Sequence, residues 1–196
     1  IDVEYQKLIA PEPDVTCYFQ QARLAAGDKA VLDEAQKLWL TMLEPPEACR
    51  PVLEALIRDN RVTADDVWTR ARRQFEANRT GNARNTLGAL PASQTPDAKA
   101  LDLVISSPMG YLARQPGNWN TTRAGRELAA LAIQRIAAND PRAAANELEK
   151  LQGRMQESER QWAWSQIGLQ AAKKHYPEAV AWFAQAGSAP LSDEGY

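Results

Sequence analysis

Few residues of this chain have the types and spacing that catalysis or metal binding requires. There is one histidine, His175, and there are two cysteines, Cys17 and Cys49, which stand far apart. Zinc sites need grouped Cys or His ligands, and a serine or cysteine nucleophile needs a positioned base. His175 follows two lysines near an expected helix end, where a cation interacts with the helix dipole. We therefore expect no metal site and no histidine-dependent hydrolase.

Glutamates are the next candidates, because a protonated carboxyl group can act as a general acid on a glycosidic bond. Such an acid needs an apolar cleft that keeps it protonated near neutral pH. Glu147, Glu149, Glu157 and Glu159 instead lie among Lys and Arg residues, as is typical of a solvent-exposed helix face. Glu127, beside Leu128, is less clear. We expect no catalytic residue within this chain.

Composition and charge exclude several classes of protein. The 196 residues are 44% hydrophobic and 24% charged, with a net charge of -2. A dedicated nucleic-acid binder is normally strongly basic, so no nucleic-acid partner is expected. No apolar run approaches the roughly 20 residues of a transmembrane helix, and phosphate-binding glycine loops are absent, so neither a membrane span nor a nucleotide cofactor is expected. The first residue is not Met, from which we expect a processed or excised chain.

The elements that must position these residues are predicted to be helices almost throughout. After Gly27-Asp28, apolar residues recur on one helical face, and Pro45-Pro46 ends that helix. Thr63 is placed to cap the next helix, which carries acidic residues in its first turn. Further helices are expected at about 80–90, 97–106, 119–139, 141–152, 157–174 and 177–187, with short broken helices in the proline-rich stretch 91–119.

A weak internal repeat predicts how these helices stack. One spacing recurs in Ala35-x3-Trp39-x2-Met42, Ala144-x3-Leu148-x2-Leu151 and Ala179-x3-Phe183-x2-Ala186. Trp164-x2-Ile167-Gly168 resembles the first helix of a tetratricopeptide hairpin, with a small residue where two helices approach closely. We therefore expect an all-α superhelix, or solenoid, of antiparallel helical hairpins that forms a single domain over residues 1–196.

The two cysteines fit one helical hairpin. Cys17 lies in the first helical segment and Cys49 follows the Pro45-Pro46 break, so an antiparallel return brings them together. A disulfide there would add about 3 to 4 kcal/mol in the chain-entropy model. The alternative is two buried free thiols in a cytosolic protein. We expect the disulfide, and with it an exported, oxidising location.

Around these cysteines the sequence resembles the superhelical domain of soluble lytic transglycosylases. The family pattern is C-Y, a small residue before a turn, a helix ending in L-W-L, and a second cysteine soon after. The matching segments are Cys17-Tyr18, Gly27-Asp28, Leu38-Trp39-Leu40 and Pro46-Glu47-Ala48-Cys49. The match is clearest over residues 15–60, and the rest agrees in helical character only.

The resemblance implies a periplasmic bacterial enzyme that acts on peptidoglycan. Such enzymes cleave glycan strands between N-acetylmuramic acid and N-acetylglucosamine and leave a 1,6-anhydro end. Their catalytic domain resembles goose-type lysozyme and follows the helical region. This chain contains neither the E-S-x-F helix start nor the G-L-M-Q segment of that domain. The expectation is a superhelical segment truncated before its catalytic domain, which scaffolds the enzyme and positions glycan strands or cell-wall enzyme partners.

Two groups of residues are candidates for contact with glycan or peptide. One is a basic stretch, which we interpret either as a positive wall for the carboxylates of peptide stems or as a charged outer helix face. The other is a pair of tryptophans, suited either to stacking on sugar rings or to packing between helices. The candidates are Arg70, Arg73, Arg79, Arg84, Trp162 and Trp164.

A second hypothesis is a stand-alone periplasmic adaptor. Tetratricopeptide-like hairpins can bind peptides in a concave groove without any catalytic domain. If the gene continued past Tyr196 into the missing segments, the transglycosylase hypothesis would hold, whereas a stop codon there would favour the adaptor.

Overall fold

The computed structural model describes residues 2–5, 7–187 and 189, and these residues form helices joined by turns and loops, with no strand among them. The all-α class expected from the sequence is confirmed. The chain divides into two compact units, residues 1–90 and 91–196. That residues 1–196 behave as one domain stays a prediction.

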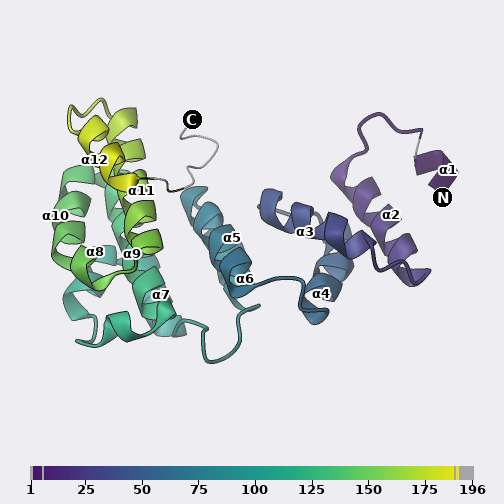
Figure 1. The fold of residues 1–196 in the computed structure, drawn as a ribbon, viewed down its shortest axis with the longest axis horizontal. Helices are drawn as coiled ribbons and strands as arrows, with labels where there is room; N and C mark the ends of the chain where they lie inside the picture. The colour runs from purple at the N-terminus through teal and green to yellow at the C-terminus, as the bar shows by residue number, and fades with distance from the viewer. Residues whose placement is uncertain (1, 6, 188, 190–196) are drawn as a thin grey trace. The chain divides into compact units, whose positions relative to one another are not determined.

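The first unit is a series of short helices (Figure 1). Consecutive elements pack against each other, α3 on α4 and α5 on α6, and α2 packs on both η1 and α4. Its elements are α1 (Asp2–Tyr5), α2 (Pro13–Ala25), α3 (Val31–Thr41), the 3-10 helix η1 (Glu47–Cys49), α4 (Arg50–Arg58), α5 (Ala64–Glu76) and α6 (Thr80–Leu87).

Local sequence signals explain where these helices begin and end. The apolar stripe of α3 is buried, with Ala35 fully covered and Trp39 only 5% exposed. α5 begins with a capping box, in which the Thr63 side chain accepts a hydrogen bond from the Asp66 amide and Asp66 accepts one from the Thr63 amide. The predicted cap is confirmed.

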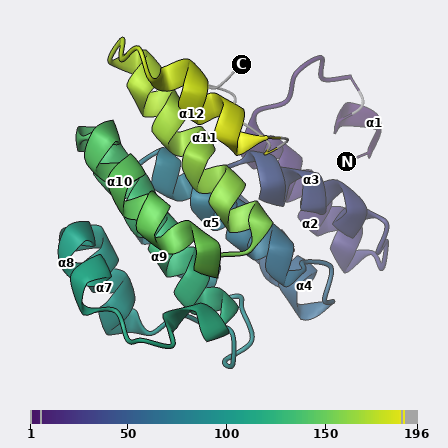
Figure 2. The same ribbon diagram turned by 60° about the vertical axis from the view of Figure 1, so that its left-hand side comes forward.

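The second unit is built around one buried helix, α9. Residues 129–133 of α9 have no solvent exposure, because α7, α8, α10 and α11 all pack against it. Figure 2 shows α9, α10 and α11 side by side. The elements are α7 (Ala98–Ser106), α8 (Pro108–Arg114), η2 (Trp119–Thr121), α9 (Arg123–Asn139), α10 (Pro141–Leu151), η3 (Gln152–Arg154), α11 (Glu157–Lys173) and α12 (Ala179–Ala186).

One predicted helix is wrong at its start. The sequence indicated a continuous helix over 119–139, but the chain is extended at Thr122, where φ is -110° and ψ is 152°. The Thr122 side chain accepts a hydrogen bond from the Gly125 amide and so caps α9. α9 therefore begins at Arg123, and residues 119–121 form a separate 3-10 turn.

The close approach predicted at Gly168 is confirmed. A β-carbon on Gly168 of α11 would lie 2.9 Å from the ring of Phe183 on α12. Glycine therefore allows these two helices to pack closely.

Within the described residues, none of the helices combines the length and the apolar character needed to cross a membrane.

Candidate functional site

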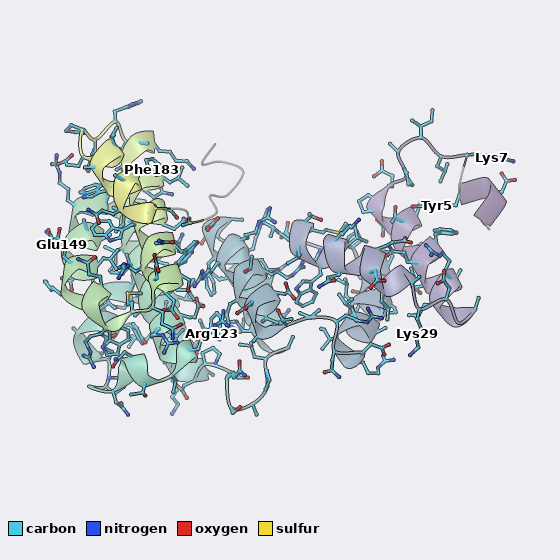
Figure 3. The ribbon with its side chains drawn as sticks, in the orientation of Figure 1. Tyr5, Lys7, Lys29, Arg123, Glu149 and Phe183 are labelled. Carbon is cyan, nitrogen blue, oxygen red and sulfur yellow. A yellow bond between two sulfur atoms is a disulfide. The ribbon has the colours of Figure 1, made fainter. Side chains whose placement is uncertain are left out.

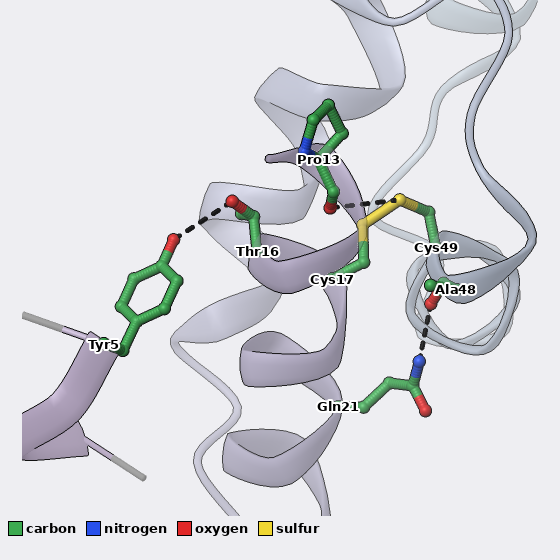
Figure 4. The surroundings of a disulfide bond; sticks show 7 residues. All are labelled: Tyr5, Pro13, Thr16, Cys17, Gln21, Ala48 and Cys49. Carbon is green, nitrogen blue, oxygen red and sulfur yellow. Dashed lines mark hydrogen bonds between the residues drawn. A yellow bond between two sulfur atoms is a disulfide. The ribbon is translucent and has the colours of Figure 1, made fainter. Parts of the chain in front are cut away.

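A disulfide fixes the beginning of the first unit. Cys17 and Cys49 are bonded with an S–S distance of 2.00 Å, joining α2 to η1 (Figure 4). Beside it, the Gln21 side-chain amide donates to the carbonyl oxygen of Ala48 over 2.5 Å. The predicted disulfide is confirmed, and neither cysteine is a free thiol.

The basic stretch of the first unit is partly internal. Arg70 is only 2% exposed, and its guanidinium lies 4.6 Å from the centre of the Trp39 ring. The same group donates a hydrogen bond to the carbonyl oxygen of Trp39. Burial, and secondarily the charge of Arg73, lowers the pKa of Arg70 to about 10. Arg70 therefore packs inside the unit and does not lie on its surface.

Two further side chains of α5 donate hydrogen bonds to backbone carbonyls at and just after the end of α3. Arg73 donates to the carbonyl oxygen of Leu40 over 2.6 Å, and Gln74 donates to that of Leu43 over 2.9 Å. The last carbonyls of a helix have no partner within it, so these side chains supply the missing donors. The polar face of α5 thus anchors the end of α3.

The outer part of the basic stretch remains accessible. Arg79 is half-exposed and lies 3.3 Å from Glu44 in an ion pair. Arg84 is exposed on α6. Of the four arginines proposed as contacts, these two retain surface positions, while Arg70 and half-buried Arg73 hold α3.

The proposed aromatic contacts are buried in the second unit. Trp162 is 5% exposed and Trp164 is 3% exposed. The indole nitrogen of Trp164 donates to the side-chain oxygen of Gln152 over 3.2 Å. Both tryptophans therefore pack between helices.

His175 is exposed just after α11, where its amide donates to the carbonyl of Ala172.

Glu159 is not on a solvent-exposed face, which corrects the expectation from its charged sequence neighbours. It is 2% exposed and forms an ion pair with Arg126 of α9 at 3.0 Å. It also accepts a hydrogen bond from the Gln156 amide over 2.8 Å at the start of α11. Glutamate three residues after a cap residue is a sequence signal for this contact, and it was overlooked.

Glu127, whose position the sequence left open, is fully buried on α9. Arg123, at the amino end of the same helix (Figure 3), lies 3.4 Å from its carboxylate. Glu127 and Glu159 therefore each contact an arginine, and neither is an isolated carboxyl group in an apolar cleft, the arrangement that acid catalysis on a glycoside requires.

A hollow of about 290 Å³ opens in the second unit, where three helices meet. Its walls come from the loop before α7, the first turn of α7, α8, the loop through η2, and the first turns of α9. The lining residues are Ser93, Thr95, Pro96, Asp97, Ala100, Tyr111, Pro116, Asn118, Trp119, Thr121, Thr122, Ala124, Gly125 and Leu128.

The caps of two helices shape this hollow. The Asp97 carboxylate accepts a hydrogen bond from the Ala100 amide at the start of α7. The Thr122 hydroxyl does the same for the Gly125 amide at the start of α9, over 3.1 Å. Both capping side chains line the hollow, so helix formation itself fixes where they lie.

Trp119 forms a firm wall. It is 4% exposed, and the Arg154 guanidinium lies 5.3 Å from the centre of its ring. Arg154 also donates to the side-chain oxygen of Asn120 over 2.7 Å. A β-carbon on Gly125 would overlap the carbonyl oxygen of Trp119, so only glycine lets η2 sit this close to α9.

Tyr111 of α8 is the buried polar group of the hollow. It is 5% exposed, and burial raises the pKa of its hydroxyl to about 12. Like any tyrosine hydroxyl, it is protonated at neutral pH and can donate a hydrogen bond. Sequence reasoning passed over Tyr111 and Trp119 because they lie in the proline-rich stretch 91–119, although two aromatic residues in a loop-rich segment were a usable signal.

The described residues contain no cluster of His, Cys, Asp or Glu side chains that could hold a metal ion.

Comparisons with known proteins identify the fold. No family model and no curated protein matches the sequence. An inactive mutant of the lytic transglycosylase Slt from Pseudomonas aeruginosa is 24% identical, with a TM-score of 0.69 over 90% of this chain and 29% of that one. The 70 kDa soluble lytic transglycosylase Slt70 from Escherichia coli is 21% identical, with a TM-score of 0.62 over 98% of this chain and 32% of that one. The chain shares the helical fold of part of these enzymes.

The same likeness extends to a complex of the 70-kDa soluble lytic transglycosylase with bulgecin A. That structure is 20% identical, with a TM-score of 0.62 over 97% of this chain. The chain spans about a third of the length of these structures. The resemblance to soluble lytic transglycosylases seen in the sequence is thus confirmed at the level of the fold.

Proposed function

We propose that this chain is the non-catalytic superhelical segment of a periplasmic lytic transglycosylase. The parent enzyme would cleave the bond between N-acetylmuramic acid and N-acetylglucosamine in peptidoglycan and form 1,6-anhydromuramic acid. The observation that carries the proposal is the fold match over 90% of this chain to a lytic transglycosylase. The segment would scaffold the enzyme and position glycan strands or other cell-wall enzymes.

The disulfide supports the proposed location. Disulfides persist in the bacterial periplasm and are rare in the cytosol, where thiols are kept reduced. The Cys17–Cys49 bond closes a hairpin near the amino end of the first unit. Its position coincides with the segment in which the sequence most resembles the family.

The pairing of the buried glutamates supports chemistry outside this segment. Glu159 and Glu127 each contact an arginine, so neither is an isolated carboxyl group in an apolar cleft. The absence of a catalytic residue from this chain is part of the proposal, and it has a direct test.

The test compares the product of the complete gene with the 196-residue chain on purified peptidoglycan sacculi. We expect the complete product to release 1,6-anhydromuropeptides, detected by mass spectrometry, and the chain alone to release none. Release by the chain alone would overturn the non-catalytic assignment. A complete gene product without lytic activity that binds peptides would overturn the transglycosylase assignment in favour of a periplasmic adaptor.

A further inference from the structure

The hollow between α7, α8 and α9 contains a buried hydroxyl group that no neighbour uses. Tyr111 lines the hollow, and no hydrogen bond to its hydroxyl occurs within the described part of the chain. The hydroxyl oxygen is also not fully enclosed by protein atoms. A ligand that enters the hollow can therefore reach it. A ligand that covers this hydroxyl without accepting its hydrogen bond leaves a polar group unpaired, which is costly, whereas a ligand that accepts the bond avoids that cost.

The lining excludes three classes of ligand. None of the lining residues is Lys or Arg, and Asp97 contributes a negative charge, so an anion is disfavoured. Asp97 is also the single carboxylate of the lining, which is too few for a divalent cation. A purely apolar ligand would leave the Tyr111 hydroxyl without a partner.

A neutral sugar ring fits what remains. A pyranose has hydroxyl groups at its edge and apolar C–H groups on its faces. The hollow combines hydroxyl and amide side chains, such as Ser93 and Asn118, with the aromatic Trp119 and the apolar Leu128. Its volume of about 290 Å³ is at the lower limit of small-molecule pockets, which admits one ring with its substituents.

We propose that this hollow binds one N-acetylhexosamine residue of a glycan strand. The Tyr111 hydroxyl donates to the acetamido carbonyl, and the acetyl methyl packs against Ala124 and Leu128. The identity of the glycan rests on the proposed function, whereas the class of ligand follows from the lining. The hollow is a positioning subsite and takes no part in bond cleavage.

Several contacts hold the elements that line the site in place, which favours binding of a weakly interacting ring. The capping hydrogen bonds of Asp97 and Thr122 fix the first turns of α7 and α9. The Arg154 contact and the missing side chain of Gly125 fix Trp119. Little ordering is then required when the sugar enters, so less free energy opposes binding.

The experiment is an amide NMR titration of the 196-residue chain with tetra-N-acetylchitotetraose. We expect saturable shifts of the Ala100, Thr122, Ala124 and Gly125 amides. Maltotetraose, which lacks acetamido groups, should bind at least several-fold more weakly. Unshifted hollow amides would overturn the proposal, and equal affinity for the two sugars would overturn the assignment of the acetamido group.

Two variants test how much the Tyr111 hydroxyl contributes to binding. Tyr111→Phe removes the oxygen alone, and we expect about threefold to tenfold weaker binding of chitotetraose, the range for one neutral hydrogen bond. Tyr18→Phe is the matched control, because Tyr18 is 63% exposed on α2 and lies in the other unit. Equal affinity of Tyr111→Phe and Tyr18→Phe would overturn the role of the hydroxyl.

A measurement on the unaltered chain covers the case in which Tyr111→Phe does not fold. With ¹³C-labelled tyrosine rings, the Tyr111 resonance should shift on addition of chitotetraose, and an unshifted resonance would overturn the contact. Cosedimentation with purified sacculi separates this inference from the proposed function. The chain could sediment with sacculi while chitotetraose causes no shift of the hollow amides. That result would overturn the proposed subsite and leave the proposed function supported.

Discussion

Replacing Gly125 with alanine tests whether the close contact between η2 and α9 organises the second unit. Gly125 lies in the first turn of α9, where alanine would normally stabilise a helix by up to about 1 kcal/mol. Here the new β-carbon would overlap the backbone carbonyl oxygen of Trp119. A backbone group cannot rotate away as a flexible side chain can, so η2 or the start of α9 must move.

The expected magnitude follows from the groups that move. Overpacking of this kind costs about 1 to 3 kcal/mol, and displacement of the first turn also weakens the cap bond from the Gly125 amide to Thr122. The gain in helix propensity offsets about 1 kcal/mol of this loss. We therefore expect Gly125→Ala to lower the free energy of unfolding by about 1 to 3 kcal/mol.

Gly81→Ala is the matched control, because it makes the same chemical change in a helix without a neighbour in the way. Gly81 lies in α6, and a β-carbon there meets no atom within 4 Å. Urea unfolding followed by circular dichroism should show a gain of about 0.5 to 1 kcal/mol for Gly81→Ala. If Gly125→Ala were as stable as the unaltered chain, or more stable, the reasoning on this contact would be refuted.

Three further predictions concern the disulfide, Tyr111 and one helix cap. Thiol titration in denaturant without reductant should find neither Cys17 nor Cys49 free. Replacing both with serine should lower the free energy of unfolding by about 4 kcal/mol for a sequence separation of 32, measured by urea unfolding. An unchanged unfolding midpoint would contradict this. The Tyr111 pKa is about 12 when folded and 10.0 in the unfolded reference, so above pH 10 the unfolded chain releases this proton first and stability falls by about 2 kcal/mol by pH 12. Tyr111→Phe should lack that component, and identical pH profiles would exclude it. Asp140→Ala removes the acceptor for the Arg142 and Ala143 amides at the start of α10 and should lower thermal stability by about 1 kcal/mol, whereas an unaltered melting temperature would show that the cap is dispensable.

Local features of the sequence were predicted well where one residue determines its own surroundings. Thr63 caps α5 as expected, because its hydroxyl needs only an amide three residues away. Cys17 and Cys49 were paired correctly, because a single hairpin brings them together. Gly168 was recognised as a close approach between helices, and its contact with Phe183 confirms that interpretation.

The errors concern polar residues whose partners lie on other elements. Arg70 was considered a surface residue, but it is buried against Trp39, which is 31 positions away. Glu159 was considered solvent-exposed, but it pairs with Arg126, which is 33 positions away. A helical pattern shows which residues share a face, but it does not show whether a neighbouring helix covers that face.

The amino-acid sequence by itself determined the helical periodicity, several helix ends, the cysteine pair and the resemblance in fold. These depend on backbone preferences and on contacts within one turn or one hairpin. Only the tertiary structure decided that Arg70 supports the end of α3, that Glu159 is held by Arg126, and that Tyr111 faces a hollow between three helices. Each of these depends on which helices pack together, because burial and hydrogen-bond partners come from residues distant in the chain.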